Sequence, residues 1–267
     1  MKILCVGDIV GEAGRRALEE HLPGLKEEFQ VDFTIVNGEN AAGGAGLTPR
    51  IAEQLFRSGA DVLTLGDHVW DRPELVEYLD GEKRIIRPAN FPADTPGRGW
   101  CVTAAKGGKK IGVINLLGRV FMRYNVDCPF RKLKAILKEI KPETNTIVVD
   151  FHAEATSEKV AFGFFSDGEV SAVVGTHTHI QTADEKILPK GTAYITDLGM
   201  TGPYDSVIGQ DKDKIIERFL TSRPVRFEVA KSDVQLHGVV VDVNDNTGLA
   251  NNIVRLQRRS PWPLGTG

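Results

Sequence analysis

The chain has little cysteine, no long hydrophobic run and no excess of charge of one sign. It contains three cysteines and no Cys-x-x-Cys pair, which excludes a disulfide framework and a zinc ribbon and indicates a reducing, cytoplasmic location. Its apolar runs are short, such as Thr146 to Phe151, whereas a membrane span needs roughly 18 apolar residues. Asp8 lies too near the start for a signal peptide. We therefore expect no membrane partner.

The near-balance of charge excludes another class of partner. Lysine and arginine total 33, and aspartate and glutamate total 36, so the formal net charge is −3. Because the chain has no global basic field, we expect no bulk binding of nucleic acid. The hydrophobic content of 41% and the charged content of 26% are close to those of soluble globular proteins, which excludes collagen-like, disordered and coiled-coil chains.

Short runs rich in β-branched residues alternate with helical patterns along the chain. Thr48 and Pro49 are typical of a helix N-terminus, and Gly59 is typical of the end of that helix. Because strands and helices alternate at this spacing, we expect an α/β fold with covered sheets. The predicted strands are 2–6, 33–36, 62–65, 101–105, 111–117, 146–151, 172–175, 192–196, 225–229, 236–243 and 253–256, and the predicted helices are 12–22, 49–56, 73–79, 130–140 and 214–220.

The sequence shows no sign of a division into two domains. Its 267 residues would allow one large domain or two small ones. No repeat, low-complexity tract or linker interrupts the alternating pattern. We therefore expect a single domain over residues 1–257, followed by a loose tail at 258–267.

Acidic, amide and histidine side chains recur at one place, directly after predicted strands. Asp8 follows the first strand, and His152 follows the strand at 146–151. In open α/β sheets, binding sites form outside the carboxyl ends of the strands, so side chains far apart in sequence would converge there. The candidate residues are Asp8, Glu39, Asn40, Asp67, His68, His152, His177 and His179.

This mixture of oxygen and nitrogen donors predicts a transition-metal centre. Carboxylates, an amide oxygen and imidazoles suit manganese, iron, cobalt or zinc better than magnesium or calcium, which prefer oxygen alone. Even without His68, seven candidate ligands exceed what one ion needs when solvent must also bind. Two ions about 3.5–4 Å apart, bridged by a carboxylate and a hydroxide, would use these ligands and would clamp both oxygens of an in-line displacement at phosphorus.

Each of these residues also has an ordinary structural interpretation. A single Asp or His after a strand is more often a turn former or a satisfied polar residue than a ligand. Four of the six histidines fall at strand ends beside acids, however, whereas His21 and His237 fall inside a predicted helix and a predicted strand. Gly7, Gly11 and Gly14 lack the spacing of a dinucleotide-binding loop. The combination therefore favours the metal centre.

Five short motifs resemble those of the calcineurin-like metallophosphoesterases. They are Gly7-Asp8, Gly38-Glu39-Asn40, Gly66-Asp67-His68, His152 and Gly175-Thr176-His177-Thr178-His179. More narrowly, the chain resembles the YmdB-like bacterial phosphodiesterases from residue 1 to about residue 257. The segments that carry this closer resemblance are 37–44, 115–122, 150–159, 175–184 and 197–209.

The resemblance implies a four-layer α/β/β/α sandwich with a dinuclear metal site. It makes His68 a general acid or a transition-state hydrogen-bond donor. The implied cofactors are two divalent or mixed-valence ions per chain, with iron or manganese favoured over zinc or cobalt. The implied activity is phosphodiester hydrolysis by metal-hydroxide attack, including cyclic nucleotides such as 2′,3′-cyclic AMP. The implied ligands are Asp8, Glu39, Asn40 and His179 for one ion, and Glu39 as a bridge, Asp67, His152 and His177 for the other.

Two positions depart from the wider superfamily. Val10 stands where an Asp-x-His motif would place histidine, and the YmdB-like pattern suggests that Asn40 fills this vacancy. Asp67 stands where a Gly-Asn-His motif has asparagine. With Asp67 ionised, three carboxylates and a hydroxide would neutralise two divalent ions, whereas an asparagine would leave one positive charge. We therefore expect Asp67 to hold metal more tightly and to attract an anionic substrate less.

Other functions are compatible with the same residues. A metal hydroxide also attacks phosphomonoesters and carbonyl compounds, so a phosphomonoesterase and an amide or ester hydrolase are alternatives. A metal-bound, RNA-associated regulator with little turnover is a further alternative, which the near-neutral charge disfavours. We expect a small phosphodiester or nucleotide as the substrate and a homo-oligomer as the assembly.

Overall fold

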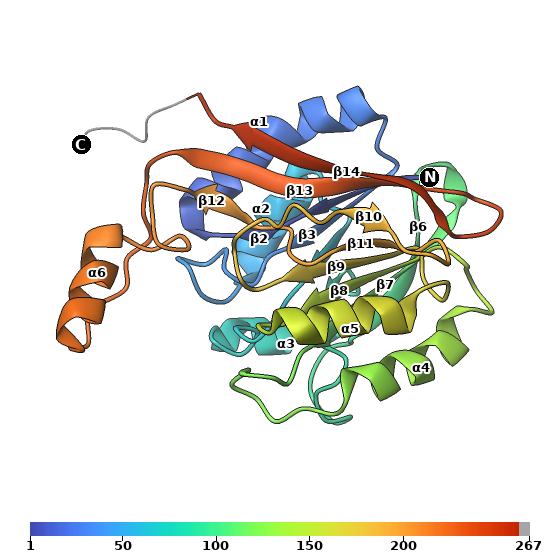
Figure 1. The fold of residues 1–267 in the computed structure, drawn as a ribbon, viewed down its shortest axis with the longest axis horizontal. Helices are drawn as coiled ribbons and strands as arrows, with labels where there is room; N and C mark the ends of the chain where they lie inside the picture. The colour runs from blue at the N-terminus through green and yellow to red at the C-terminus, as the bar shows by residue number, and fades with distance from the viewer. Residues whose placement is uncertain (262–267) are drawn as a thin grey trace.

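The computed structural model describes residues 1–261, which form a mixed α/β structure with two β-sheets (Figure 1). A short 3-10 helix at Lys106–Gly108 links the strands of the predicted hairpin. The strands are β1 (Lys2–Val6), β2 (Asp8–Ile9), β3 (Phe33–Asn37), β4 (Val62–Thr64), β5 (Ile85–Ile86), β6 (Trp100–Ala104), β7 (Lys110–Leu117), β8 (Ile147–His152), β9 (Ala172–Thr176), β10 (Lys186–Ile187), β11 (Ala193–Ile195), β12 (Met200–Pro203), β13 (Val234–Val243) and β14 (Ala250–Arg259). The α-helices are α1 (Gly11–Phe29), α2 (Pro49–Ser58), α3 (Pro73–Gly81), α4 (Pro129–Ile140), α5 (Thr156–Ser166) and α6 (Lys212–Thr221).

Both sheets have a parallel centre. The eight-stranded sheet has the order β2-β12-β13-β1-β3-β4-β5, with β14 paired to β13, and its strands β1, β3, β4 and β5 are parallel. The six-stranded sheet has the order β10-β11-β9-β8-β7-β6, and its strands β7, β8, β9 and β11 are parallel. Because parallel strands end at the same edge of a sheet, each sheet gathers several carboxyl ends at one place.

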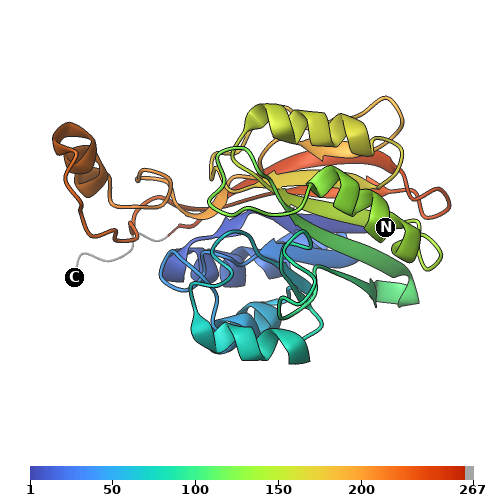
Figure 2. The ribbon, with the colours of Figure 1, turned by 90° about the horizontal axis from the view of Figure 1, so that it is seen from below.

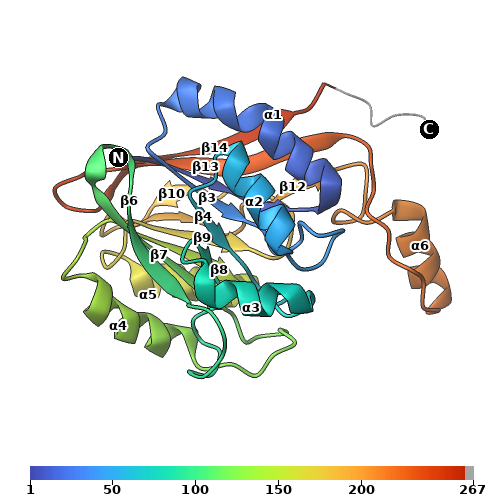
Figure 3. The same cartoon turned by 180° about the vertical axis from the view of Figure 1, so that it is seen from behind.

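The central strands are buried on both faces. Ile3 and Cys5 of β1 contact the apolar side chains that lie between the two sheets. Leu4 and Val6 face the other way and pack with apolar residues of α1, α2 and α3. On the far side of the smaller sheet, α4 and α5 pack through apolar side chains such as Phe162. Figure 2 and Figure 3 show the helices on the outer sides of the paired sheets.

The helix α2 begins and ends where the sequence predicts. The Thr48 hydroxyl accepts a hydrogen bond from the backbone N–H of Ile51 at 3.3 Å, and Pro49 occupies the first helical position. Gly59 ends the helix with a φ of 112°, which a residue with a side chain rarely adopts. These contacts fix the position of the loop that joins β3 to α2.

The strand predicted at 225–229 is wrong. This segment has no regular structure, and Val229 forms only an isolated bridge with Gln210. Residues 226–228 are exposed, so no sheet face covers them. A run with β-branched residues becomes a strand only where an open sheet edge and a packing surface receive it.

Other differences concern lengths, one missed helix and four short strands, β2, β5, β10 and β12, for which the sequence predicts no element. The first helix continues through Pro23 to Phe29, and α5 lies in a segment for which we predicted no element. The strand β14 runs to Arg259, so the expected loose tail is wrong for residues 258 and 259. The remainder of that predicted tail at 262–267 lies outside the described residues.

The helices are covered to different degrees. Figure 1 shows α6 projecting away from the two sheets, at the end of the molecule that carries the chain from β12 to β13. Phe219 and Leu220 on this helix are 80% and 81% exposed. Within residues 1–261, we find no helix that is both long enough and apolar enough to cross a bilayer.

Candidate metal centre

The polar residues predicted from the strand ends gather at the carboxyl edge of both sheets. The strands β1, β3 and β4 of the larger sheet meet β8 and β9 of the smaller sheet at this place. Four residues each offer one donor atom, and these four atoms lie within 4.8 Å of one another. They are Glu39, Asp67, His152 and His177. The structure thus brings together side chains that are up to 138 positions apart.

The Nε2 atom of His152 lies at the centre of this cluster. It is 3.1 Å from Glu39 Oε1, 3.2 Å from Asp67 Oδ1 and 3.0 Å from His177 Nδ1. Burial alone would lower the pKa of His152, but Glu39 and Asp67 raise it well above its ordinary value. The two carboxylates therefore concentrate negative charge around one nitrogen atom, as they would around a cation.

The opposite nitrogen of His152 has a fixed role. Its Nδ1 lies 2.9 Å from the Thr176 hydroxyl, and that hydroxyl donates its proton to Asp150 Oδ1 at 2.6 Å. Because the Thr176 proton is committed to Asp150, Nδ1–H of His152 donates to Thr176, so a cation that displaces the proton on Nε2 would meet the Nε2 lone pair. Asp150 also accepts hydrogen bonds from Asn37 at 3.1 Å and from Thr64.

Glu154, an acid on the solvent side, orients the ring of His177 through Nε2, so that the other nitrogen, Nδ1, faces the cluster. The Nε2 atom of His177 lies 3.1 Å from Glu154 Oε2, and Nδ1 lies 3.3 Å from Asp67 Oδ1. Donation of Nε2–H to Glu154 leaves the Nδ1 lone pair directed at the cluster. A carboxylate behind a histidine in this arrangement orients the ring and raises its basicity as a metal ligand.

The ring of His179 is also held in one tautomer. Its Nδ1–H donates to the backbone carbonyl of Ile208 at 2.9 Å. The Nε2 lone pair therefore faces Asn40, whose Nδ2 lies at 3.1 Å, and Asp8, whose Oδ1 lies at 3.9 Å. Burial lowers the pKa of His179, which favours the neutral form that binds metal.

A buried ion pair holds the loop that carries His177 and His179. Both residues have positive φ angles, 99° and 66°, which cost conformational energy for residues with side chains. Between them, Thr178 donates to Asp197 from its backbone N–H at 3.1 Å and from its hydroxyl at 2.7 Å. Asp197 is paired with Lys159 at 2.6 Å. These bonds compensate the strain and keep both imidazoles directed inward.

Asp8 carries an oxygen atom without a partner. Its Oδ1 is buried and accepts no hydrogen bond from any described residue. The nearest imidazole nitrogens are those of His179 at 3.9 Å and His152 at 4.0 Å. Burial, with neighbouring acids, raises the pKa of Asp8 to about 8. An unpaired buried carboxylate oxygen is costly, and a cation at this place would remove the cost.

The backbone leaves room for such a cation only because residue 66 is glycine. A Cβ atom at Gly66 would lie 2.2 Å from Glu39 Oε2 and 2.4 Å from His152 Nε2. Any other residue at position 66 would displace the side chains of Glu39 and His152. The donor set, the orphaned oxygen of Asp8 and this cradle together fit a metal ion.

Asn40 lies beside the candidate ligands, as predicted, but its amide nitrogen faces them in place of its amide oxygen. Its Nδ2 donates to Glu39 Oε1 at 3.1 Å and faces His179. Ligation needs the amide oxygen, so Asn40 would bind metal only after a half-turn of its amide group. Oxygen and nitrogen of an amide occupy nearly the same volume, so this rotation needs no repacking.

His68 lies on the solvent side and outside the group of converging donors. Its backbone N–H donates to Glu39 Oε2 at 3.2 Å, and its Nδ1 lies 2.7 Å from Asp71 Oδ2. Asp71 also accepts from Arg123 at 2.7 Å, and Arg123 Nε lies 3.9 Å from Asp67 Oδ2. Although partial burial opposes it, hydrogen bonds from His68 and Arg123 lower the pKa of Asp71. Because Nδ1 of His68 is paired with Asp71, Nε2 is the ring nitrogen that can contact a ligand.

Several of these supporting residues were missed in the sequence. Asp150 and His152 are two positions apart on one strand, so their side chains share a face, and this spacing could have drawn attention to Asp150. Asp71 follows His68 by three positions. Arg123 and Glu154 carried no comparable signal, because tertiary contacts alone bring them to the centre.

Comparison with known proteins decides the family. Residues 4–256 match the family described as YmdB-like protein. The chain belongs to this family. It is 52% identical over 256 residues, 96% of both chains, to the 2′,3′-cyclic-nucleotide 2′-phosphodiesterase of Bacillus subtilis. The resemblance expected from the motifs is therefore confirmed.

Solved structures show the same similarity across the whole fold. A hypothetical protein from Thermus thermophilus is 40% identical, with a TM-score of 0.91, and the match covers 98% of this chain and 100% of that one. A structure described as a novel phosphatase from Mycoplasma pneumoniae is 37% identical, also with a TM-score of 0.91, and the match covers 97% and 93%. The mixed α/β architecture is therefore that of the family.

Proposed function

We propose that the chain is a metal-dependent phosphodiesterase that acts on small phosphodiesters. The observation that carries this proposal is the convergence of Glu39, Asp67, His152 and His177 beside the unpaired oxygen of Asp8. The Bacillus subtilis relative is named for action on 2′,3′-cyclic nucleotides, and we propose the same substrate class here. The chain thus belongs among hydrolases of phosphoric ester bonds.

The ligand geometry supports two ions. Glu39 would be the ligand that the two ions share, since Glu39 Oε1 lies 3.1 Å from His152 Nε2 and 3.1 Å from Asn40 Nδ2. When bound, the two ions would lower the pKa of a water molecule and neutralise charge that develops on the phosphate oxygens. The mixed donors favour iron or manganese, with zinc or cobalt as alternatives. The proposed ligands are Asp8, Glu39, Asn40 and His179 for one ion, and Glu39, Asp67, His152 and His177 for the other.

The residues on the solvent side would act on the substrate. Asp71 accepts Nδ1–H of His68, so His68 can carry a proton at Nε2 and give it to the leaving oxygen. Arg123 is anchored by Asp71 and offers its remaining guanidinium hydrogens to the non-bridging oxygens of the phosphate. Asp67 offsets part of the positive charge at this place and so tempers the attraction for an anion.

The wider assignments are proposals of the same kind. The apolar clusters support a four-layer α/β/β/α sandwich of the calcineurin-like type, formed as one domain over residues 1–257. Phe219 and Leu220 on the projecting α6 would be covered in a homo-oligomer. The low cysteine content supports a cytoplasmic location. With a net charge of −3, we propose no bulk nucleic-acid binding.

Metal analysis together with a substrate panel tests the proposed function. Protein purified without chelator is expected to carry two transition-metal ions per chain and to hydrolyse 2′,3′-cyclic AMP and bis-p-nitrophenyl phosphate. Mono-p-nitrophenyl phosphate is the comparison substrate. Faster hydrolysis of the monoester would replace the proposal with a phosphomonoesterase. RNA binding without turnover of any phosphodiester, in protein replete with metal, would replace it with a regulator.

A further inference from the structure

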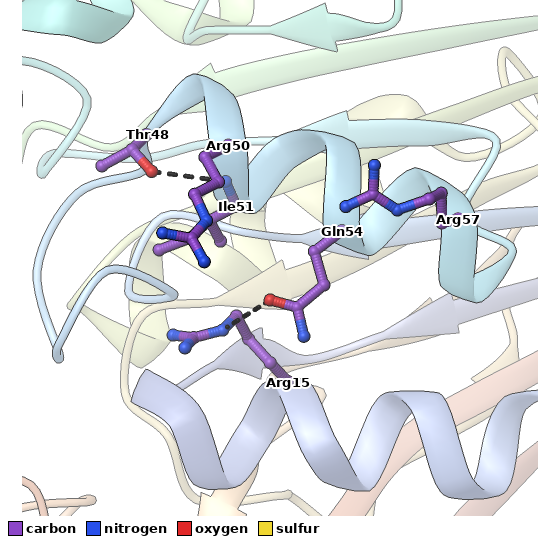
Figure 4. Close-up of a pocket in the computed structure, with 6 residues that line it drawn as sticks. All are labelled: Arg15, Thr48, Arg50, Ile51, Gln54 and Arg57. Atoms are coloured by element: carbon purple, nitrogen blue, oxygen red, sulfur yellow. Dashed lines mark hydrogen bonds between the residues drawn. The ribbon is translucent and has the colours of Figure 1, made fainter.

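A pocket lined by three arginines lies outside the candidate metal centre, between α1 and α2 (Figure 4). Its volume is about 610 Å³. In Figure 4, Arg15 reaches it from α1, Thr48 precedes α2, and the remaining side chains lie along α2 from its first turn at Arg50 to its last turn at Arg57. The pocket is lined by Arg15, Thr48, Arg50, Ile51, Gln54 and Arg57.

Three arginines and no acidic residue line the pocket. Within residues 1–261, the guanidinium groups of Arg15, Arg50 and Arg57 form no ion pair with a carboxylate within 4.0 Å. The partners of Arg15 are neutral, since its Nε donates to Gln54 Oε1 at 3.1 Å and its NH1 to the Ala41 carbonyl at 2.5 Å. Burial lowers the pKa of Arg15, and the neighbouring Arg50 lowers it further against the opposing effect of Glu12.

The other groups at the pocket are suited to an anion as well. Gln54 uses its oxygen for Arg15, which leaves its Nε2 as a hydrogen-bond donor. The helix α2 is ten residues long and begins at Pro49, so the positive end of its dipole lies at the Thr48 side of the pocket. Guanidinium groups match the geometry of phosphate oxygens and bind them through paired hydrogen bonds.

We propose that this pocket binds the phosphate group of a phosphorylated small molecule, at a site separate from the metal centre. Arg50 and Arg57 are exposed and would close on the phosphate from α2, while Arg15 would contact it from α1. A dianion would neutralise three guanidinium groups that form no ion pair with a carboxylate of the described residues. This assignment does not depend on catalysis at the metal centre.

The pocket is also connected to the loop that supplies two metal ligands. Arg15 donates to the carbonyl of Ala41, the residue after Asn40. The carbonyl of Asn40 accepts from the backbone N–H of Gly11 at the start of α1. A phosphate that draws the Arg15 guanidinium toward the pocket would therefore act on the backbone beside Asn40.

Hydrogen–deuterium exchange followed by mass spectrometry tests the proposal on the metal-loaded protein. Inorganic phosphate and AMP are the two probes, and sodium chloride at matched ionic strength is the salt control. Both probes are expected to slow exchange in peptides covering residues 41–57. Equal protection by the two identifies the phosphate group alone as the ligand, and stronger protection by AMP identifies a nucleotide.

Variants locate the protected site. The double variant Arg50→Ala/Arg57→Ala should weaken phosphate binding at this pocket at least about tenfold, because two charge-assisted contacts are lost. Both residues are exposed, so the helix should fold. Arg223→Ala, at another exposed arginine, is the matched control and should bind as the wild type does.

A further variant separates this pocket from the metal centre. Glu39→Gln should keep the protection at 41–57, whatever it does to turnover. Protection that disappears in Glu39→Gln would mean that the phosphate acts at the metal centre, which would overturn the proposal. Protection that is unchanged in the arginine double variant would overturn it as well.

Discussion

The candidate metal centre has a buried half and an exposed half, and the two are built differently. On the buried side, Asp8 and His152 are fully covered, and the His152 ring is oriented by Thr176. On the solvent side, the side chains of His68 and Arg123 are 31% and 42% exposed. Burial and fixed hydrogen bonds suit residues that would hold ions, whereas partial exposure suits residues that would give a hydrogen bond or a proton to a substrate.

The largest effect is expected from the residue that links the ligand groups. Glu39→Ala should remove metal and activity together, because the carboxylate is shared and no described neighbour can replace it. Elemental analysis and a turnover assay on the same preparation measure both losses. Glu53→Ala, on the half-buried face of α2, is the control. A Glu39→Ala protein that keeps two ions per chain would contradict the site assignment.

His68→Ala tests whether the exposed half acts on the substrate without holding metal. We expect turnover of a phosphodiester to fall by about 10²–10⁴-fold, the usual contribution of general acid catalysis, with most of the metal retained. The measurement pairs steady-state rates with metal content. His21→Ala, which loses only the hydrogen bond to Ser260 at 3.1 Å, should keep the wild-type rate. An equal loss of metal in His68→Ala would place His68 among the ligands.

Asp150→Asn tests the buried support of His152. In the wild type, Asn37, Thr64 and Thr176 all donate to the carboxylate of Asp150. An asparagine at this position keeps only one acceptor oxygen, and its amide N–H would face one of these donors. The orientation of Thr176, and with it the tautomer of His152, should loosen. We expect metal affinity to fall about 10–100-fold, as is typical when the partner of a ligating histidine is changed. Competition with a metallochromic chelator measures this, and Asp94→Asn at an exposed position is the control.

The smallest effect is expected at Asp67, which touches both halves. Asp67→Asn removes one negative charge and restores the commoner motif, so we expect weaker metal retention and a lower KM for an anionic substrate. Chelator competition and steady-state kinetics separate the two effects. Tighter metal binding by Asp67→Asn would refute the charge argument.

The sequence predicted the central strands and their ends more accurately than the peripheral segments and the short strands β2, β5, β10 and β12. The parallel strands are apolar on both faces, and polar side chains follow them abruptly, so their limits are visible in the pattern. Thr48, Pro49 and Gly59 likewise marked α2 because caps act locally. The segment at 225–229 could not be judged in this way, because a strand exists only where a neighbouring strand accepts its hydrogen bonds.

The helix α5 was missed for a related reason, since the surface that stabilises it lies elsewhere in the chain. Its 11 residues include three phenylalanines and little polar alternation, so no periodic face stands out. Phe162 instead finds its place against Phe151 of β8, with ring centroids 4.2 Å apart. The packing surface that stabilises this helix belongs to the sheet, and the helix sequence alone does not contain it.

The sequence by itself determined that acidic and histidine side chains such as Glu39, Asp67, His152 and His177 would converge, because they follow parallel strands that end at one edge. Only the tertiary structure decided how their donor atoms are directed. The lone pair of His152 depends on Thr176 and Asp150, and that of His177 depends on Glu154. A tautomer or an unpaired oxygen is a property of neighbours, and these neighbours come from elements that the chain order does not place together.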